Sequence, residues 1–206
     1  MDLKGWLQQC PIIAILRGIK PEEAEPICDT LEKTGICIVE VPLNSPNALS
    51  SISILSRSFG SRMLIGAGTL TDPSHVAEVA AAGGQLIVTP HADTAIVRAA
   101  KSAGLIAVPG FFTPAEGFAL LHAGADGLKL FPSDVLGIPM LKALQAVLPA
   151  KTIVIPVGGV DAERILPWMK AGAGGVGVGS SIYKPGDSLA AIDAKAKTLV
   201  AATRSI

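Results

Sequence analysis

The sequence has 206 residues, of which 50% are hydrophobic and 17% charged, so it predicts a folded chain with a full apolar core. Its formal net charge is zero and no run of lysine or arginine breaks the pattern, which argues against nucleic acid or an anionic membrane as partner. The apolar runs are interrupted within about ten residues, which is too short to span a bilayer.

The beginning of the chain and its cysteines favour a cytoplasmic protein. Asp2 is an early acid and no long apolar run follows it, so we expect no secretory signal. Cys10, Cys28 and Cys37 show no CxxC spacing and leave an odd thiol, which predicts buried, inert thiols in a reducing compartment. The three histidines are scattered without ligand spacing, so we expect neither a metal nor another cofactor.

Apolar runs alternate with alanine-rich segments of helical period along the chain. The first segment, 2–9, predicts a short extra helix that caps the bottom of the fold. The predicted strands are 11–17, 36–43, 63–69, 86–90, 105–110, 127–132, 152–158 and 174–180. The predicted helices are 21–34, 46–58, 73–82, 92–103, 113–123, 139–148, 161–171 and 188–203. Proline and acids begin several helices, as at Pro21, and glycine follows them, as at Gly35.

Eight strand–helix units in succession predict parallel strands joined by helical crossovers, an α/β fold. Eight such units that close on themselves form a (β/α)8 TIM barrel, here a single domain over 1–206. The alternative is an open doubly wound sheet, whose pattern would switch partway along the chain. The even repeats favour the barrel.

Three charged residues interrupt strands that should be apolar. They are Arg17, Glu40 and Lys129, in the first, second and sixth predicted strands. Parallel strands are buried on both faces, and alternation along each strand would aim these three side chains into the barrel. One buried charge alone is as easily explained by a structural ion pair. Three near the ends where barrel active sites form favour a shared functional site.

These residue types suit covalent chemistry on a 2-keto acid. Burial lowers the pKa of a lysine, so that a neutral amine is available to attack a ketone and form a Schiff base. Glu40 offers a carboxyl group that can move protons, and Arg17 offers a forked cation that matches a carboxylate.

The last two predicted strands end in glycine, which suits a phosphate. Loops after the seventh and eighth strands of a barrel often bind phosphate through backbone N–H groups, and glycine permits the close approach. The candidates are Gly158, Gly159, Gly179 and Ser180, with Asp161 interpreted as the N-cap of the next helix. A third glycine segment, 66–69, suggests contact with the carboxylate or carbonyl instead.

With these motifs the chain resembles the 2-keto-3-deoxy-6-phosphogluconate and 6-phosphogalactonate aldolases over nearly its whole length. The motifs are Ile13-Ala14-Ile15-Leu16-Arg17-Gly18, Val39-Glu40-Val41-Pro42-Leu43-Asn44-Ser45-Pro46, Ile65-Gly66-Ala67-Gly68-Thr69, Leu128-Lys129-Leu130-Phe131-Pro132-Ser133, Val157-Gly158-Gly159-Val160 and Gly177-Val178-Gly179-Ser180.

The resemblance implies a metal-free class I aldolase, a homotrimer of barrels that yields pyruvate and glyceraldehyde 3-phosphate. It implies that Lys129 forms the Schiff base, that Glu40 relays protons, and that Arg17 and Thr69 hold the carboxylate end. The remaining implied contacts are phosphate binding by Gly158, Gly159, Gly179 and Ser180, and pocket walls at Pro90 and Phe131.

Asn44-Ser45-Pro46 stands where gluconate-type members usually have an Arg-Thr pair, so the resemblance favours 2-dehydro-3-deoxy-6-phosphogalactonate as substrate. The gluconate isomer and 4-hydroxy-2-oxoglutarate are alternatives within the family. Phe111-Phe112 is bulkier than the family pattern, which suggests a tighter pocket or an altered preference. Isomerisation or cyclisation of another sugar phosphate, and non-catalytic sensing of a phosphosugar, remain open alternatives.

Overall fold

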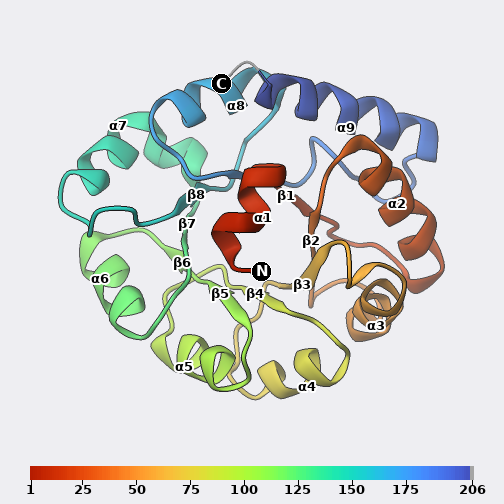
Figure 1. The fold of residues 1–206 in the computed structure, drawn as a ribbon, viewed down its shortest axis with the longest axis horizontal. Helices are drawn as coiled ribbons and strands as arrows, with labels where there is room; N and C mark the ends of the chain where they lie inside the picture. The colour runs from red at the N-terminus through yellow and green to blue at the C-terminus, as the bar shows by residue number, and fades with distance from the viewer. Residues whose placement is uncertain (205–206) are drawn as a thin grey trace.

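Strands stand at the centre of the molecule and helices surround them (Figure 1). The computed structural model describes residues 1–204, so the last two residues of the predicted domain lie outside the described residues. The strands are β1 (Ile12–Ile15), β2 (Ile38–Pro42), β3 (Leu64–Gly68), β4 (Leu86–Val88), β5 (Ile106–Val108), β6 (Gly110–Phe111), β7 (Leu128–Leu130), β8 (Val154–Pro156) and β9 (Val176–Val178). The helices are α1 (Leu3–Gln9), α2 (Pro21–Thr34), α3 (Ala48–Phe59), α4 (His75–Ala81), α5 (Thr94–Ser102), α6 (Pro114–His122), α7 (Ser133–Gln145), α8 (Ala162–Lys170) and α9 (Leu189–Thr203).

All the paired strands are parallel, as the strand–helix alternation predicts. The larger sheet has the order β5-β4-β3-β2-β1-β9, and the smaller has the order β6-β7-β8. The first and last strands are neighbours, because Ile13 in β1 pairs with both Ile38 in β2 and Gly177 in β9. The strand order does not reverse as a doubly wound sheet requires, and helices α2 to α9 surround the strands while α1 lies across their middle (Figure 1). The doubly wound alternative is therefore wrong.

Pro109 divides the predicted strand 105–110 into β5 and β6. Proline has no backbone N–H to donate to a neighbouring strand, and at this point the pairing changes from β4 to β7. The main chain of the β7 segment bonds both parts, with Asp126 N donating to Ala107 O at 3.0 Å and Lys129 N to Pro109 O at 2.8 Å. Just after β8, Val157 forms a parallel bridge to Gly177 of β9. The strands thus form a curled arrangement with hydrogen bonds at both junctions between the sheets.

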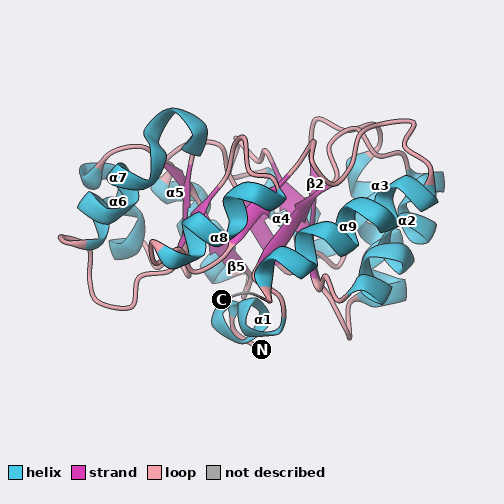
Figure 2. Ribbon diagram, turned by 90° about the horizontal axis from the view of Figure 1, so that it is seen from above, coloured by secondary structure: helices cyan, strands magenta, loops and turns pink. Residues whose placement is uncertain are grey.

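Helix α1 covers the N-terminal ends of the strands. Asp2 caps this helix by accepting a hydrogen bond from Gly5 N at 2.8 Å, as N-cap acids do. The apolar side chains of α1 pack closely against glycines that precede two strands. An added Cβ on Gly127 would lie 2.8 Å from Leu3, and one on Gly175 would lie 2.7 Å from Leu7. Figure 2 shows α1 and the N-terminus at this end of the molecule. The predicted capping helix is confirmed.

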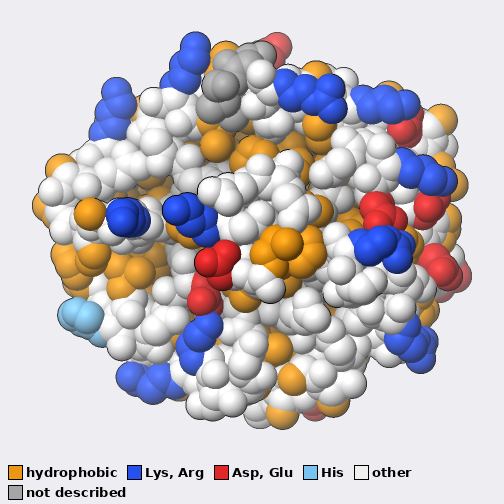
Figure 3. Space-filling model, in the orientation of Figure 1, with side chains coloured by type: hydrophobic (Ala, Val, Ile, Leu, Met, Phe, Trp, Pro, Cys, Tyr) orange, Lys and Arg blue, Asp and Glu red, His pale blue; other side chains and the backbone are white. Residues whose placement is uncertain are grey.

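The face around α1 mixes charges of both signs with apolar groups (Figure 3). Within residues 1–204, no helix has both the length and the apolar character that crossing a membrane requires. All three cysteines are buried and unpaired, as predicted for inert thiols. The strand residues form the core, with β1, β2 and β3 buried at every position.

The helix predicted at 139–148 is wrong in its bounds, since α7 runs over Ser133–Gln145. Gly137 lies inside this helix with φ 68° and ψ 174°, so α7 consists of two helical pieces that meet at a kink. Pro139 sits in the first turn of the second piece, where proline is favoured, and it produces the signal for a helix beginning there. The first piece has no such signal in the sequence.

Candidate active site

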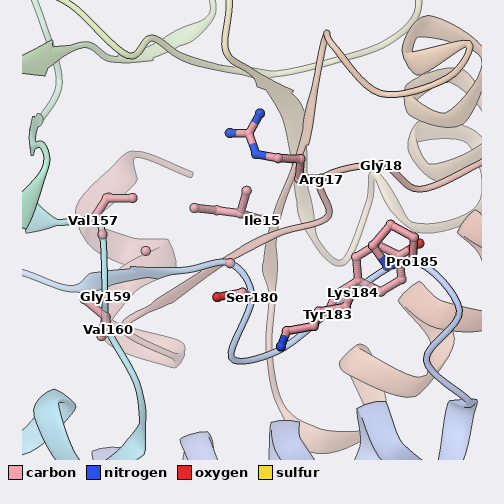
Figure 4. A pocket seen from close by; sticks show the side chains of 13 residues that line it. Ile15, Arg17, Gly18, Val157, Gly159, Val160, Ser180, Tyr183, Lys184 and Pro185 are labelled. Carbon is pink, nitrogen blue, oxygen red and sulfur yellow. The ribbon is translucent and has the colours of Figure 1, made fainter.

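A cavity of about 470 Å³ opens where β1, β8 and β9 end, opposite the end that α1 covers. Its walls include Arg17 after β1, the loop 158–160 after β8 and the segment 179–185 after β9. Figure 4 shows Gly159 and Val160 on one side of this space, Tyr183 and Pro185 on the other, and Ser180 between them. Parallel sheets commonly bind ligands at the carboxyl ends of their strands.

Glu40 lies in the middle of β2 and is almost completely buried, with 1% of its surface exposed. Its carboxyl group fits against the backbone of β3 only because Gly68 has no side chain, since a Cβ at that position would overlap the carboxyl atoms. Oxygen Oε2 has no hydrogen-bond partner among the described residues. Burial raises the pKa of Glu40 to about 7, and the charges of Lys129 and Arg17 oppose this rise. A carboxyl group with this pKa can both release and accept protons near neutral pH.

Lys129 lies in the middle of β7 with 4% of its surface exposed. Its Nζ is 4.7 Å from the centre of the Phe131 ring. Burial lowers the pKa of Lys129, the negative charge of Glu40 opposes that effect, and the positive charge of Arg17 adds to it. Lys129 and Glu40 influence each other's pKa without a salt bridge between them in the described part of the chain. Neither residue lines the cavity itself, and both are coupled electrostatically to Arg17 in its wall.

Arg17 is in the site, but the prediction that it is a buried strand residue is wrong. Strand β1 ends at Ile15, and the Arg17 side chain is exposed at the cavity rim. Strand alternation does not apply here because the chain has left the sheet and turns at Gly18, whose φ is 83°. The guanidinium group donates to Asn44 Oδ1 at 2.7 Å and to Thr69 Oγ1 at 3.2 Å.

Thr69 directly follows β3 and has φ 52°, a conformation that side chains with a branched Cβ rarely adopt. The segment 66–69 thus brings a hydroxyl group next to Arg17 and a glycine next to Glu40. Gly110 in β6 separates Pro90 from Lys129. Gly110 pairs with Lys129, and the backbone of Pro90 packs so closely on its other side that an added Cβ would lie 2.6 Å from the Pro90 carbonyl carbon.

The four predicted phosphate contacts all line the cavity: Gly158, Gly159, Gly179 and Ser180. Gly158 has φ 112° and Gly159 has φ 64°, so the loop after β8 needs glycine at both positions. Asp161 then begins α8 as predicted, with its side chain accepting a hydrogen bond from Arg164 N at 3.1 Å. The N-terminus of α8 is a favourable neighbour for an anion.

Sequence reasoning missed several residues in the cavity wall. Tyr183, Lys184 and Pro185 line it, and Lys184 adds a second cation to that of Arg17. A lysine five positions after Gly179, at the glycine end of the last strand, was the available signal. Asn44 was noted only for its difference from a family pattern, whereas in the structure it holds Arg17. Within residues 1–204, no cluster of three or more histidine, cysteine or acidic side chains is placed to hold a metal.

Phe111 and Phe112 do not line the cavity, and their effect on substrate preference stays a prediction. Phe111 is buried and points toward α6, where a Cβ on Gly117 would lie 3.2 Å from its ring. Phe112 is 43% exposed at the surface. Phe111 therefore packs between β6 and α6, and Phe112 lies past the end of the strand.

The arrangement joins three chemical functions in one site. An amine with a lowered pKa and a carboxyl group with a raised pKa are both buried and interact electrostatically. A guanidinium group stands at the rim, and glycine loops with a further lysine line the cavity beside it. This combination suits covalent chemistry on a carbonyl compound that bears two anionic groups.

Comparisons with known proteins agree with this chemistry. The family model for KDPG and KHG aldolases matches residues 3–196. The chain is 42% identical over 199 residues to the 2-dehydro-3-deoxy-6-phosphogalactonate aldolase of Escherichia coli (strain K12), covering 97% of each chain. It is 28% identical over 196 residues to the 2-dehydro-3-deoxy-phosphogluconate aldolase of Dickeya dadantii (strain 3937), covering 91% of this chain and 90% of the relative. A solved structure described as native KDPGal superimposes with a TM-score of 0.94 at 42% identity, covering 96% of each chain.

Proposed function

Because the chain belongs to the KDPG and KHG aldolase family, we propose that it cleaves 2-dehydro-3-deoxy-6-phosphogalactonate to pyruvate and glyceraldehyde 3-phosphate. The observation that carries this proposal is the buried pair of Lys129 and Glu40, which shift each other's pKa and are both coupled to Arg17 in the wall of a cavity with glycine loops. The enzyme is thus an aldehyde-lyase whose nucleophile is a lysine amine and which needs no metal.

Lys129 supplies the nucleophile. Its neutral amine attacks the C2 ketone of the substrate, forms a carbinolamine, and loses water to give a protonated Schiff base. The cation draws electrons from the C3–C4 bond, which breaks to leave an enamine on Lys129 and an aldehyde. Burial lowers the pKa of Lys129, which favours the neutral form of the amine that this attack requires.

Glu40 moves the protons of this reaction. Its ionised carboxylate accepts the proton of the C4 hydroxyl group as the C3–C4 bond breaks. The same proton is then available to C3 of the enamine, which becomes the methyl group of pyruvate before hydrolysis frees Lys129. Free Oε2 and a pKa of about 7 support both steps.

Arg17 and Thr69 hold the carboxylate of the keto acid. Both partners of the Arg17 guanidinium group are neutral oxygens, so within the described residues no acid neutralises its charge. Its remaining N–H groups are available for a bidentate pair with a carboxylate. The phosphate at the other end of the substrate then lies among the glycine loops, with Pro90 and Phe131 beside the reacting carbons.

The isomer assignment rests on the comparison of relatives. The chain is 42% identical to a galactonate-type enzyme and 28% identical to a gluconate-type enzyme. Asn44 also stands where the gluconate type usually has arginine, and here it bonds Arg17 rather than a substrate. The two substrates differ in configuration at C4, so rates on the two isomers decide the question. We expect kcat/KM to be about tenfold or more higher for the galactonate isomer.

Borohydride trapping tests the covalent mechanism. Incubation with pyruvate and borohydride should leave a reduced adduct on Lys129, located by peptide mass spectrometry. Lys129→Met should abolish both the adduct and cleavage, whereas Lys170→Met on the exposed face of α8 should change neither. A parent enzyme that turns over while Lys129 stays unmodified would refute the Schiff base.

We also propose that the strands close into a (β/α)8 barrel. The Val157–Gly177 bridge and the Asp126–Ala107 hydrogen bond link the two sheets at both junctions, which supports closure. Amide hydrogen exchange should find the N–H groups of β6 and β8 as protected as those of β1.

We infer further that the enzyme is a homotrimer in the cytoplasm. Phe112 and Val135, which are 43% and 72% exposed, are apolar surface residues of the kind that an interface covers. The buried, unpaired thiols support a reducing compartment. Light scattering after gel filtration should give three times the mass of the chain.

A further inference from the structure

The loop 158–160 is bonded from behind, on the side away from the cavity. Ser133 Oγ donates to Gly158 O at 2.9 Å, and Arg164 Nη1 donates to Gly159 O at 2.9 Å. Neither side chain lines the main cavity. Both line a second, smaller cavity of about 290 Å³, which Gly158 also borders. The loop is therefore a wall between two cavities, and its carbonyl groups are bonded on one face.

The fixed carbonyl groups determine where the N–H groups point. A trans peptide is planar, with its C=O and N–H in opposite directions. Within residues 1–204, the peptide before Pro132 is the cis bond, so those after Gly158 and Gly159 are trans. When Gly158 O points to Ser133, the N–H of Gly159 points away from it. The same reasoning turns the N–H of Val160 away from Arg164.

These two N–H groups have no protein acceptor among the described residues. Gly159 and Val160 both line the main cavity, so the N–H groups are available to a ligand there. Successive backbone N–H groups in such a loop form a concave site for an anion. The loop offers them as a pair only while both carbonyl groups are held in place.

Ser133 and Arg164 are built to hold them. Ser133 is fully buried, and its own N–H donates to Val157 O at 2.8 Å. It therefore donates to the carbonyl groups of both Val157 and Gly158, the two residues that follow β8. Arg164 lies in the first turn of α8, and Asp161 Oδ2 lies 4.0 Å from its Nε. This acid keeps the guanidinium group behind the loop.

We propose that Ser133 and Arg164 are positioning residues for phosphate recognition, acting through the carbonyl groups of Gly158 and Gly159. This inference rests on the proposed function, because it assigns the phosphate of the substrate to this loop. Neither residue touches the ligand or the reacting atoms. Their loss should weaken recognition of the phosphate and leave the chemistry at Lys129 intact.

Aldol synthesis from pyruvate with two aldehydes tests this proposal. For Ser133→Ala we expect KM for glyceraldehyde 3-phosphate to rise about tenfold, the effect of one lost hydrogen bond, with kcat changed less than about twofold. With unphosphorylated glyceraldehyde, kcat/KM should match that of the parent. Arg164→Gln should act in the same direction, and Arg164→Lys should restore part of the loss.

Matched variants separate positioning from general damage. Ser51 is equally buried and its hydroxyl has no hydrogen-bond partner within residues 1–204, so Ser51→Ala should leave turnover of both aldehydes unaffected. Arg98→Gln, in α5, removes an arginine that bonds Thr94 of its own helix. Should Ser133→Ala fail to fold, the exposed Arg164 variants still provide the test. An equal loss with both aldehydes, or an unchanged KM for the phosphorylated one, would overturn the proposal.

Two further readouts distinguish failure of this inference from failure of the proposed function. Deuterium exchange at the methyl group of pyruvate reports the Lys129 enamine and should be the same in every positioning variant. Calorimetry with glycerol 3-phosphate reports the loop without any aldol step, and Ser133→Ala should bind about tenfold more weakly. A parent without exchange would refute the aldolase chemistry, and a parent that does not bind glycerol 3-phosphate would refute the loop assignment.

Discussion

Gly68→Ala should separate the proton-transfer step from Schiff-base formation. The backbone of Gly68 is not in the left-handed region, so alanine causes no backbone strain there. The added methyl group would instead overlap the carboxyl group of Glu40, which is 1% exposed and has no free space beside it. Either the carboxyl group rotates out of its place or β3 moves.

The structure sets the size of both effects. Overpacking of this kind costs about 1–3 kcal/mol, which corresponds to a fall in Tm of roughly 2–10 °C for a chain of this size. A misplaced general acid–base costs about 10²–10⁴-fold in rate, so kcat should fall at least about a hundredfold. Borohydride should still trap pyruvate on Lys129, because the three atoms nearest the added methyl group all belong to Glu40.

Gly84→Ala is the matched control. A Cβ there would lie 2.6 Å from Val79 Cγ1, in a crowded place remote from the carboxyl group. It should lower Tm by a similar amount and change kcat less than about twofold. A Gly68→Ala enzyme that folds and keeps the parent's kcat would refute the view that this glycine seats Glu40 for proton transfer.

Three more predictions follow from the site and its surroundings. Glu40 has a pKa of about 7 in the folded state against an ordinary value of 4.5, so the folded chain binds the extra proton and the parent loses stability as pH rises between these values. In denaturant titrations, the stability of Glu40→Gln should not fall with pH over this range. Its kcat/KM should also lack the rise through about pH 7 that the parent shows. If either pH dependence persists in the variant, Glu40 is not its source. Asn44→Ala should raise KM for the keto acid about threefold to tenfold by freeing Arg17, and an unchanged KM would show that Asn44 does not hold it. The three cysteines are buried, and burial raises their pKa values, so none should react with a thiol reagent at pH 8 until the chain is unfolded; rapid labelling of the native protein would contradict this.

The strand–helix alternation and the two central site residues could be predicted because each depends on local pattern. Glu40 and Lys129 are single charges inside apolar strands, and the paired strands on both sides keep alternation regular, so both side chains point inward as expected. Glycines after helices have positive φ where the pattern placed them, as at Gly35 and Gly172. In these places the local signal and the tertiary structure agree.

The remaining features depend on contacts between distant parts of the chain. Arg17 lies past the last paired residue of β1, and its direction is set by Asn44 and Thr69 rather than by the strand. The kink at Gly137 and the position of Lys184 in the cavity wall likewise follow from how loops meet. Hydrophobic periodicity does not report contacts between loops that are distant in the sequence, so these contacts become visible only in the structure.

Under the proposed mechanism, the order of site residues along the chain means that neither half of the chain carries out the reaction alone. Glu40, Arg17 and Thr69 all precede α4, whereas Lys129 and both glycine loops come from β7 onward. A chain clipped before β7 keeps a carboxyl group without an amine, and one that begins after β3 keeps the amine without its proton carrier. The specific activity of a preparation should therefore be proportional to its fraction of full-length, correctly folded chains, and it can be used to follow refolding or synthesis.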